Sequence, residues 1–136
     1  MNSPSYKGKI IAVEGNLGAG KSTYLSFLNK TFNDIEIVKE PVDLWQNIKG
    51  HNLLEMYYKD SKRWSFTFQT YAIISRMKLW NEALKDNSNS LKISERSMLA
   101  DRYVFGEIMA ELGNVLPVEM EVYKDIGDQV LNSWPL

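Results

Sequence analysis

The segment KIIAVEGNLGAGKST, residues 9–23, constrains the fold more than any other part of this chain. It opens with the apolar run IIAV, which suits a buried strand, and continues through three glycines into Lys21 and Ser22. The spacing G-x-x-x-x-G-K-[ST] between a strand and an amphipathic helix is typical of a phosphate-binding loop. In such a loop, glycine backbones aim successive N–H groups at an anion, and the start of the helix adds its own free N–H groups.

We therefore expect this loop to bind the phosphates of a nucleoside triphosphate together with Mg²⁺. Lys21 would neutralise the β- and γ-phosphates, and the hydroxyl of Ser22 suits the metal ion. The alternative is a glycine-rich turn that only joins a strand to a helix. The residues expected to bind the nucleotide are Gly15, Asn16, Leu17, Gly18, Ala19, Gly20, Lys21, Ser22 and Thr23.

The length and composition of the chain limit the classes of function. With 136 residues, 44% of them hydrophobic, the chain is large enough for one domain with its own core. A net charge of −1 gives no reason to propose nucleic acid or an acidic membrane as a partner. The absence of cysteine excludes thiolate nucleophiles and Cys-ligated metals, and it fits an intracellular protein. Because no apolar run resembles a membrane span or a signal peptide, we expect a cytoplasmic protein, or a mitochondrial one if it has been processed.

Predicted strands and helices alternate along the chain. The predicted strands are residues 9–14, 36–39 and 91–94. The predicted helices are residues 21–30, 61–84, 97–112 and 117–132. Alternation of this kind predicts an α/β fold, in which helices flank a parallel sheet of three strands.

Charged side chains follow the second and third predicted strands. Because ligands of α/β sheets bind beyond the carboxyl ends of the strands, Glu40, Glu95 and Arg96 should lie beside the phosphate loop. There, Arg96 and Lys21 would stabilise a transferring phosphoryl group. Glu95 would hold Mg²⁺ with Ser22, and Glu40 would take the proton of an acceptor hydroxyl. The alternatives are attack by water, as in an ATPase, or ordinary solvated charges at strand ends.

The segment RWSFTFQTYAIISRM, residues 63–77, indicates the kind of acceptor. One predicted helix face combines an amide, apolar side chains and a guanidinium, and it is formed by Gln69, Ala72, Ile73 and Arg76. A helix seldom buries Gln and Arg without a polar partner, and a nucleobase is a flat apolar partner with a hydrogen-bonding edge. The aromatic residues that would enclose such a base are Trp45, Phe68 and Phe105. Each of them is equally well explained as part of a core.

Four blocks of sequence lie in order along residues 10–105. They are GNLGAGKST, EPVDLWQN, NLLEMYYKDSKRWSFTFQTYAIISR and ERSMLADRYVF. In these blocks the chain resembles the deoxyribonucleoside kinases of the deoxycytidine, deoxyguanosine and insect multisubstrate kinase type. The resemblance implies a P-loop kinase fold that transfers phosphate from ATP, with Mg²⁺, to the 5′-hydroxyl of a deoxyribonucleoside in nucleotide salvage.

The resemblance also implies roles for individual residues. Glu40 would be the base for the 5′-hydroxyl, and Arg96 with Lys21 would stabilise the phosphoryl group. Tyr58 would hydrogen-bond the sugar 3′-hydroxyl, and Gln69 would read the edge of the base. The residues implied to bind the deoxynucleoside are Glu40, Trp45, Leu54, Tyr58, Phe68, Gln69, Arg76, Arg96, Asp101 and Phe105. Glu95 and Ser22 are the implied Mg²⁺ ligands.

Arg76 and Asp101 bear on the choice of base. They resemble the arginine–aspartate pair of the deoxycytidine and deoxyguanosine kinases, where thymidine-preferring relatives have apolar residues. A carboxylate held by arginine accepts a hydrogen bond from an exocyclic amine or a ring N–H. We therefore expect deoxyadenosine, deoxyguanosine or deoxycytidine to be preferred over thymidine. The alternative is an exposed helix charge pair of Asp101 and Arg102.

The resemblance also predicts parts that this sequence does not contain. Members of the family continue with a fourth strand, an arginine-rich lid, a fifth strand and an adenine-binding loop. We therefore expect a single truncated domain, poorly active and marginally folded by itself, that dimerises with a second copy through residues 64–84 and 104–112. The alternatives are a nucleotide-binding or dimerising module without turnover, and a nucleoside monophosphate kinase, which would need a basic cluster for the acceptor phosphate.

Overall fold

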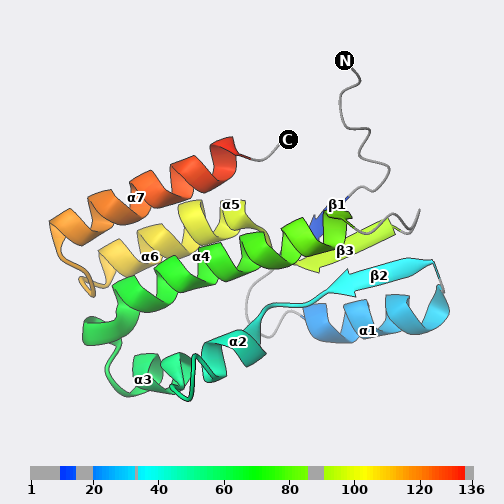
Figure 1. Ribbon diagram of the computed structural model, residues 1–136, viewed down its shortest axis with the longest axis horizontal. Coiled ribbons are helices and arrows are strands. Elements are labelled where there is room, and N and C mark those ends of the chain that lie inside the picture. Colours follow the sequence, from blue (N-terminus) through cyan, green and yellow to red (C-terminus); the bar gives the residue numbers. More distant parts are fainter. Residues whose placement is uncertain (1–9, 15–19, 33, 86–90, 134–136) are drawn as a thin grey trace. The chain divides into compact units, whose positions relative to one another are not determined.

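The computed structural model describes residues 10–14, 20–32, 34–85 and 91–133. The chain divides into two compact units. The sheet unit comprises the residues up to Glu40 together with Lys78–Ser97, and the helical unit comprises Pro41–Met77 together with the residues from Met98 onward. Helix α4, Ser61–Lys85, contributes to both units (Figure 1).

The sheet unit contains three parallel strands. They are β1 (Ile10–Val13), β2 (Ile35–Val38) and β3 (Leu91–Glu95). Their order is β1-β3-β2, so the strand that comes last in the sequence lies in the middle. The predicted parallel sheet is therefore confirmed, with each strand boundary within one residue of its predicted position.

Helices flank both faces of this sheet. Ile37 and Ile93 are in register and point to the same face, against which helix α1, Lys21–Thr31, packs (Figure 1). Ser94 points to the opposite face, where its hydroxyl accepts a hydrogen bond from Trp80 of α4. The middle strand is accordingly buried on both sides, as expected for a parallel sheet.

The helical unit consists of the first part of α4 and further helices, most of them short. They are α2 (Val42–Gln46), α3 (Leu53–Lys59), α5 (Met98–Ala100), the π-helical turn η1 (Asp101–Phe105), α6 (Gly106–Glu111) and α7 (Pro117–Asn132). One apolar cluster is built by Trp45, Leu53, Phe68 and Ala72. A second cluster is built by Met109, Met120 and Tyr123.

The predicted continuous helix over residues 97–112 was wrong in one respect, because the structure interrupts it with η1. The carbonyl of Asp101 accepts a hydrogen bond from the backbone N–H of Gly106, five residues later. The same carbonyl also accepts one from the Tyr123 hydroxyl on α7. A π-helical turn inserts one residue into a helix, and such turns occur frequently at functional sites.

None of the helices formed by the described residues has the length and apolar character needed to cross a membrane.

Candidate functional site

Four charged side chains gather where the strands of the sheet unit end. Nζ of Lys21, at the start of α1, lies 3.8 Å from Oε1 of Glu95 at the end of β3. Nη1 of Arg96, one residue further on, donates a hydrogen bond of 2.8 Å to Oε1 of Glu40. All four side chains are only 11–15% exposed. Two carboxylates and two cations therefore alternate along one edge of the sheet.

The backbone of Arg96 is unusual, since its φ angle of 65° places it in the left-handed region. A residue with a Cβ rarely adopts this conformation, and such residues concentrate at active sites. The backbone N–H of Arg96 donates to the carbonyl of Val13 on β1 at 3.0 Å. This turn directs the side chain away from the line of β3 and toward Glu40.

The phosphate loop is only partly visible. Gly15, Asn16, Leu17, Gly18 and Ala19 lie outside the described residues, as does the side chain of Ser22. Gly20 precedes α1 with a φ angle of 82°, a conformation that glycine adopts without strain. Thr23, on the first turn of α1, is exposed.

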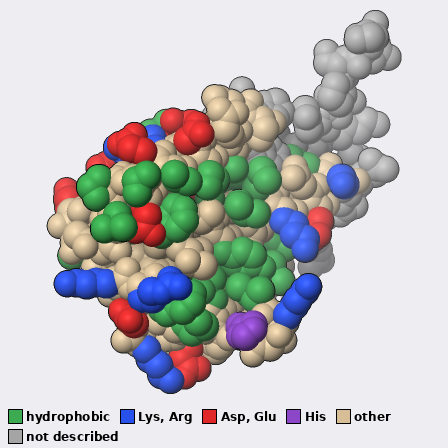
Figure 2. Space-filling view, turned by 60° about the vertical axis from the view of Figure 1, so that its left-hand side comes forward, with side chains coloured by type: hydrophobic (Ala, Val, Ile, Leu, Met, Phe, Trp, Pro, Cys, Tyr) green, Lys and Arg blue, Asp and Glu red, His purple; other side chains and the backbone are tan. Residues whose placement is uncertain are grey.

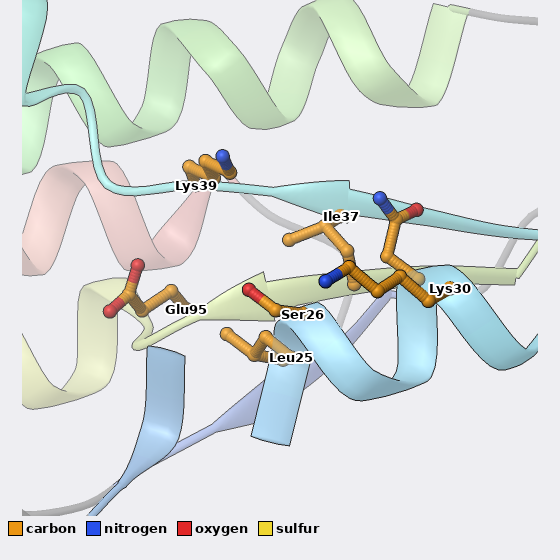
Figure 3. A pocket seen from close by; sticks show the side chains of 7 residues that line it. Leu25, Ser26, Lys30, Ile37, Lys39 and Glu95 are labelled. Atoms are coloured by element: carbon orange, nitrogen blue, oxygen red, sulfur yellow. The ribbon is translucent and has the colours of Figure 1, made fainter. Parts of the chain in front are cut away.

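A pocket of about 240 Å³ opens beside Glu95 on the α1 face of the sheet (Figure 3). Its lining residues are Leu25, Ser26, Asn29, Lys30, Ile37, Lys39 and Glu95. Pockets that enclose a small organic ligand measure about 300–1,000 Å³. This pocket is therefore too small to bury a nucleoside triphosphate.

Glu95 fits the expected magnesium ligation. Among the described residues, no group of three or more His, Cys, Asp or Glu side chains gathers. Mg²⁺ in kinase sites is held by one or two protein groups and otherwise by phosphate and water oxygens. A single carboxylate, that of Glu95 next to Lys21, has the chemistry that this ligation requires.

The helical unit contains a second, buried polar group. Nε of Arg76 lies 2.7 Å from Oδ2 of Asp101, and the two side chains are 3% and 4% exposed. Gln69, about two turns before Arg76 on α4, is also buried. The alternative interpretation, in which Asp101 and Arg102 form an exposed charge pair on a helix, is therefore wrong. Arg102 instead bonds to Asp128 of α7 at 2.9 Å.

Helix α7 holds the segment that carries Asp101. The hydroxyl of Tyr123 donates a hydrogen bond to the Asp101 carbonyl. Burial of this hydroxyl, and to a lesser degree the negative charge of the Asp101 carboxylate, raises the pKa of Tyr123, so the hydroxyl keeps its proton and remains a donor. A Cβ placed on Gly127 would lie 2.5 Å from Cδ of Arg102. Glycine at this position thus makes room for the Arg102–Asp128 ion pair.

The aromatic residues expected around the base fall into different environments. The ring of Phe68 stacks on Tyr57 with centroids 4.6 Å apart and meets Trp45 edge-on at 5.1 Å. Leu54 packs half-buried against the same cluster. Phe105 is half-buried, whereas Tyr58 is 75% exposed. Phe68, Trp45 and Leu54 therefore belong to the core of the helical unit.

Sequence reasoning missed several polar contacts in the sheet unit. Ser97 donates to the carboxylate of Glu14, which follows β1. Trp80 and Ser94 form a buried hydrogen bond of 2.8 Å. Glu14 had an indication similar to that of Glu40, because it is a carboxylate at the end of a predicted strand. Nothing in the local sequence pattern pointed to Trp80 or Ser94.

Comparisons with known proteins identify related sequences. The family model described as "Deoxynucleoside kinase" matches residues 11–136. Human deoxycytidine kinase is 37% identical over 145 residues, which cover 93% of this chain and 56% of the relative. The mitochondrial deoxyguanosine kinase of Xenopus laevis is 36% identical over 134 residues, with coverages of 86% and 51%. Deoxycytidine kinase 1 of the same species is 38% identical over 141 residues, with coverages of 90% and 53%. The chain spans about half the length of the curated relatives that it matches.

Proposed function

Because the chain belongs to the deoxynucleoside kinase family, we propose that it transfers the γ-phosphoryl group of ATP to the 5′-hydroxyl of a deoxyribonucleoside. The observation that carries this proposal is the pairing of Arg96 with Glu40 next to the pairing of Lys21 with Glu95. The proposed proton acceptor and the groups proposed to neutralise a phosphoryl group therefore lie at one edge of the sheet, which supports the proposal.

The chemistry divides among these residues. The Glu40 carboxylate takes the proton of the 5′-hydroxyl while that oxygen bonds to the γ-phosphorus and the bond from phosphorus to the ADP oxygen breaks. Arg96 contacts Glu40 at 2.8 Å, which supports a role in which its positive charge would stabilise the phosphoryl group as it meets the attacking oxygen. Lys21 neutralises the phosphates of the donor.

Glu95 and Ser22 would hold Mg²⁺, which supplies positive charge to the phosphate oxygens when bound. Assigning Glu95 to the metal and Glu40 to the proton separates the two carboxylates, since a metal-bound carboxylate is a poor base. Their different partners, Lys21 for Glu95 and Arg96 for Glu40, support that division.

The buried pair of Arg76 and Asp101 would select the base. A carboxylate that arginine holds in place accepts a hydrogen bond from an exocyclic amine, which adenine, guanine and cytosine carry and thymine lacks. A buried polar group left without its partner costs binding energy, which disfavours the wrong base. We therefore expect deoxyadenosine, deoxyguanosine or deoxycytidine to be preferred over thymidine; two of these three nucleosides appear in the names of the relatives, deoxycytidine kinase and deoxyguanosine kinase.

Exposed apolar side chains support dimerisation with a second copy. Val104, Ile108 and Leu112 recur every fourth residue and are 44–64% exposed, and Val118 and Val122 of α7 are exposed as well. Hydrophobic side chains are visible in groups at the surface in Figure 2. Burial of such side chains against a second copy would remove apolar area from water. The expected compartment is the cytoplasm. The mitochondrion is the alternative, because the deoxyguanosine kinase of Xenopus laevis is described as mitochondrial.

A kinase assay with each of the four deoxynucleosides tests the proposal. We expect ADP release from ATP that depends on the deoxynucleoside and on Mg²⁺, and that is lowest with thymidine. ATP binding without deoxynucleoside-dependent ADP release would support the nucleotide-binding module instead. Phosphorylation of a nucleoside monophosphate in preference to a nucleoside would support the monophosphate kinase. Thymidine as the best substrate would overturn the assignment of Arg76 and Asp101.

A further inference from the structure

A chain of hydrogen bonds connects helix α4 to the backbone of Arg96 within the sheet unit. Nε1 of Trp80 donates to Oγ of Ser94 at 2.8 Å, and Oγ of Ser94 lies 2.9 Å from the carbonyl oxygen of Arg96. An indole N–H can only donate, and a carbonyl can only accept. The Ser94 hydroxyl must therefore accept from Trp80 and donate to Arg96, so its orientation is determined.

Both residues that support Arg96 are buried. Ser94 is 0% exposed and Trp80 is 8% exposed. Water therefore cannot replace either hydrogen bond. Loss of one partner leaves the other partner buried without a hydrogen bond, which destabilises this arrangement. This environment makes the chain of hydrogen bonds rigid.

The supported residue is the one with the strained backbone. Arg96 has a φ angle of 65°, its N–H is bound to the carbonyl of Val13, and its own carbonyl is bound to Ser94. A left-handed conformation at a residue with a Cβ persists only where its surroundings hold it in place. The side chain that leaves from this backbone then reaches Glu40 at 2.8 Å.

We propose that Ser94 and Trp80 are positioning residues for Arg96, which hold its backbone in the conformation from which the guanidinium meets Glu40. The inference rests on the proposed function, because it is the role of Arg96 in phosphoryl transfer that makes the position matter. Neither residue contacts the substrates in this proposal. Both act on catalysis through the Arg96 carbonyl.

The test compares Ser94→Ala and Trp80→Phe with Ser65→Ala. Trp80→Phe keeps an aromatic ring but removes the N–H donor. Ser65 is the matched control, because it is 1% exposed and its hydroxyl also donates to a backbone carbonyl, that of Ser61. We expect Ser94→Ala and Trp80→Phe to lower kcat about 10- to 100-fold with little change in KM, since a misplaced catalytic group lowers turnover first. Ser65→Ala should lower the melting temperature by a similar amount without this loss of kcat.

Two further measurements separate the possible failures. In an Arg96→Ala background, Ser94→Ala should cost no further kcat, because the residue acts only through Arg96. Loss of kcat in Arg96→Ala but not in Ser94→Ala would overturn the positioning role and leave the proposed function standing. An unchanged kcat in Arg96→Ala would instead remove Arg96 from the proposed mechanism.

The backbone can also be followed without turnover. Amide hydrogen exchange at Arg96 should be about tenfold faster in Ser94→Ala than in the parent chain, and unchanged in Ser65→Ala. Unchanged exchange at Arg96 in Ser94→Ala would show that the carbonyl needs no support from the serine and would overturn the inference.

Discussion

Arg96 and Glu40 stand 56 residues apart in the sequence, yet the guanidinium Nη1 lies 2.8 Å from the carboxylate Oε1. The strand order explains the contact, because β3 lies between β1 and β2 and its end is next to the end of β2. The two side chains are 11% and 15% exposed, so solvent screens the pair less than it would a surface ion pair.

Glu40→Gln should lower kcat by at least about 100-fold, because an amide cannot take the proton of the 5′-hydroxyl. The melting temperature should change little, since the amide oxygen can still accept the hydrogen bond from Arg96. Deoxynucleoside-dependent ADP release at saturating substrate measures this. Glu121→Gln, which alters an exposed residue of α7, serves as the control and should retain the parent kcat. A fully active Glu40→Gln would exclude Glu40 as the base.

Replacing Asp101 alone should lower the free energy of unfolding far more than replacing both Asp101 and Arg76. Asp101→Ala leaves the buried Arg76 without this partner, and breaking a buried pair in this way costs about 3–5 kcal/mol. The double variant Arg76→Met/Asp101→Ala should recover part of that stability, as measured by urea unfolding.

The same double variant should also change the choice of base. The ratio of kcat/KM for thymidine to kcat/KM for deoxycytidine should rise by at least about tenfold, because the group that favours an amine is gone. An unchanged ratio in a folded double variant would contradict base selection by this pair.

Gly127→Ala should destabilise the protein by about 1–3 kcal/mol, because the new Cβ would lie 2.5 Å from Cδ of Arg102. Arg102 cannot move freely, since its Nε is bound to Asp128. In an Arg102→Ala background, the cost of Gly127→Ala should largely disappear. Urea unfolding of the four variants of this cycle measures the coupling, and equal costs in both backgrounds would show that the close approach is harmless.

Ile108→Asp should convert the proposed dimer to a monomer, because a charge would be buried in an apolar interface. Light scattering of the purified chain gives the mass in solution. Lys49→Glu, at an exposed turn, changes the charge outside the apolar surface and should leave the mass unchanged. A dimer that survives Ile108→Asp would place the interface elsewhere.

The sequence alone predicted those parts of the molecule that are built from neighbouring residues. The strand before the phosphate loop, α1 and α7 follow from apolar periodicity, glycine spacing and the proline at the start of α7, all of which act within a few residues. The carboxylate that follows β2 and the Glu95–Arg96 pair at the end of β3 were visible for the same reason. The family blocks are also a property of the sequence alone.

Only the tertiary structure decided which of these residues meet. The order β1-β3-β2, the pairing of Arg96 with Glu40 and the bond from Trp80 to Ser94 join segments that the local pattern treats as independent. The carbonyl of Asp101, at the start of the π-helical turn, accepts a hydrogen bond from a tyrosine of α7 that is 22 residues away. Side-chain periodicity reveals which face of an element is buried, but it does not identify the partner, because that choice depends on how all the elements pack together.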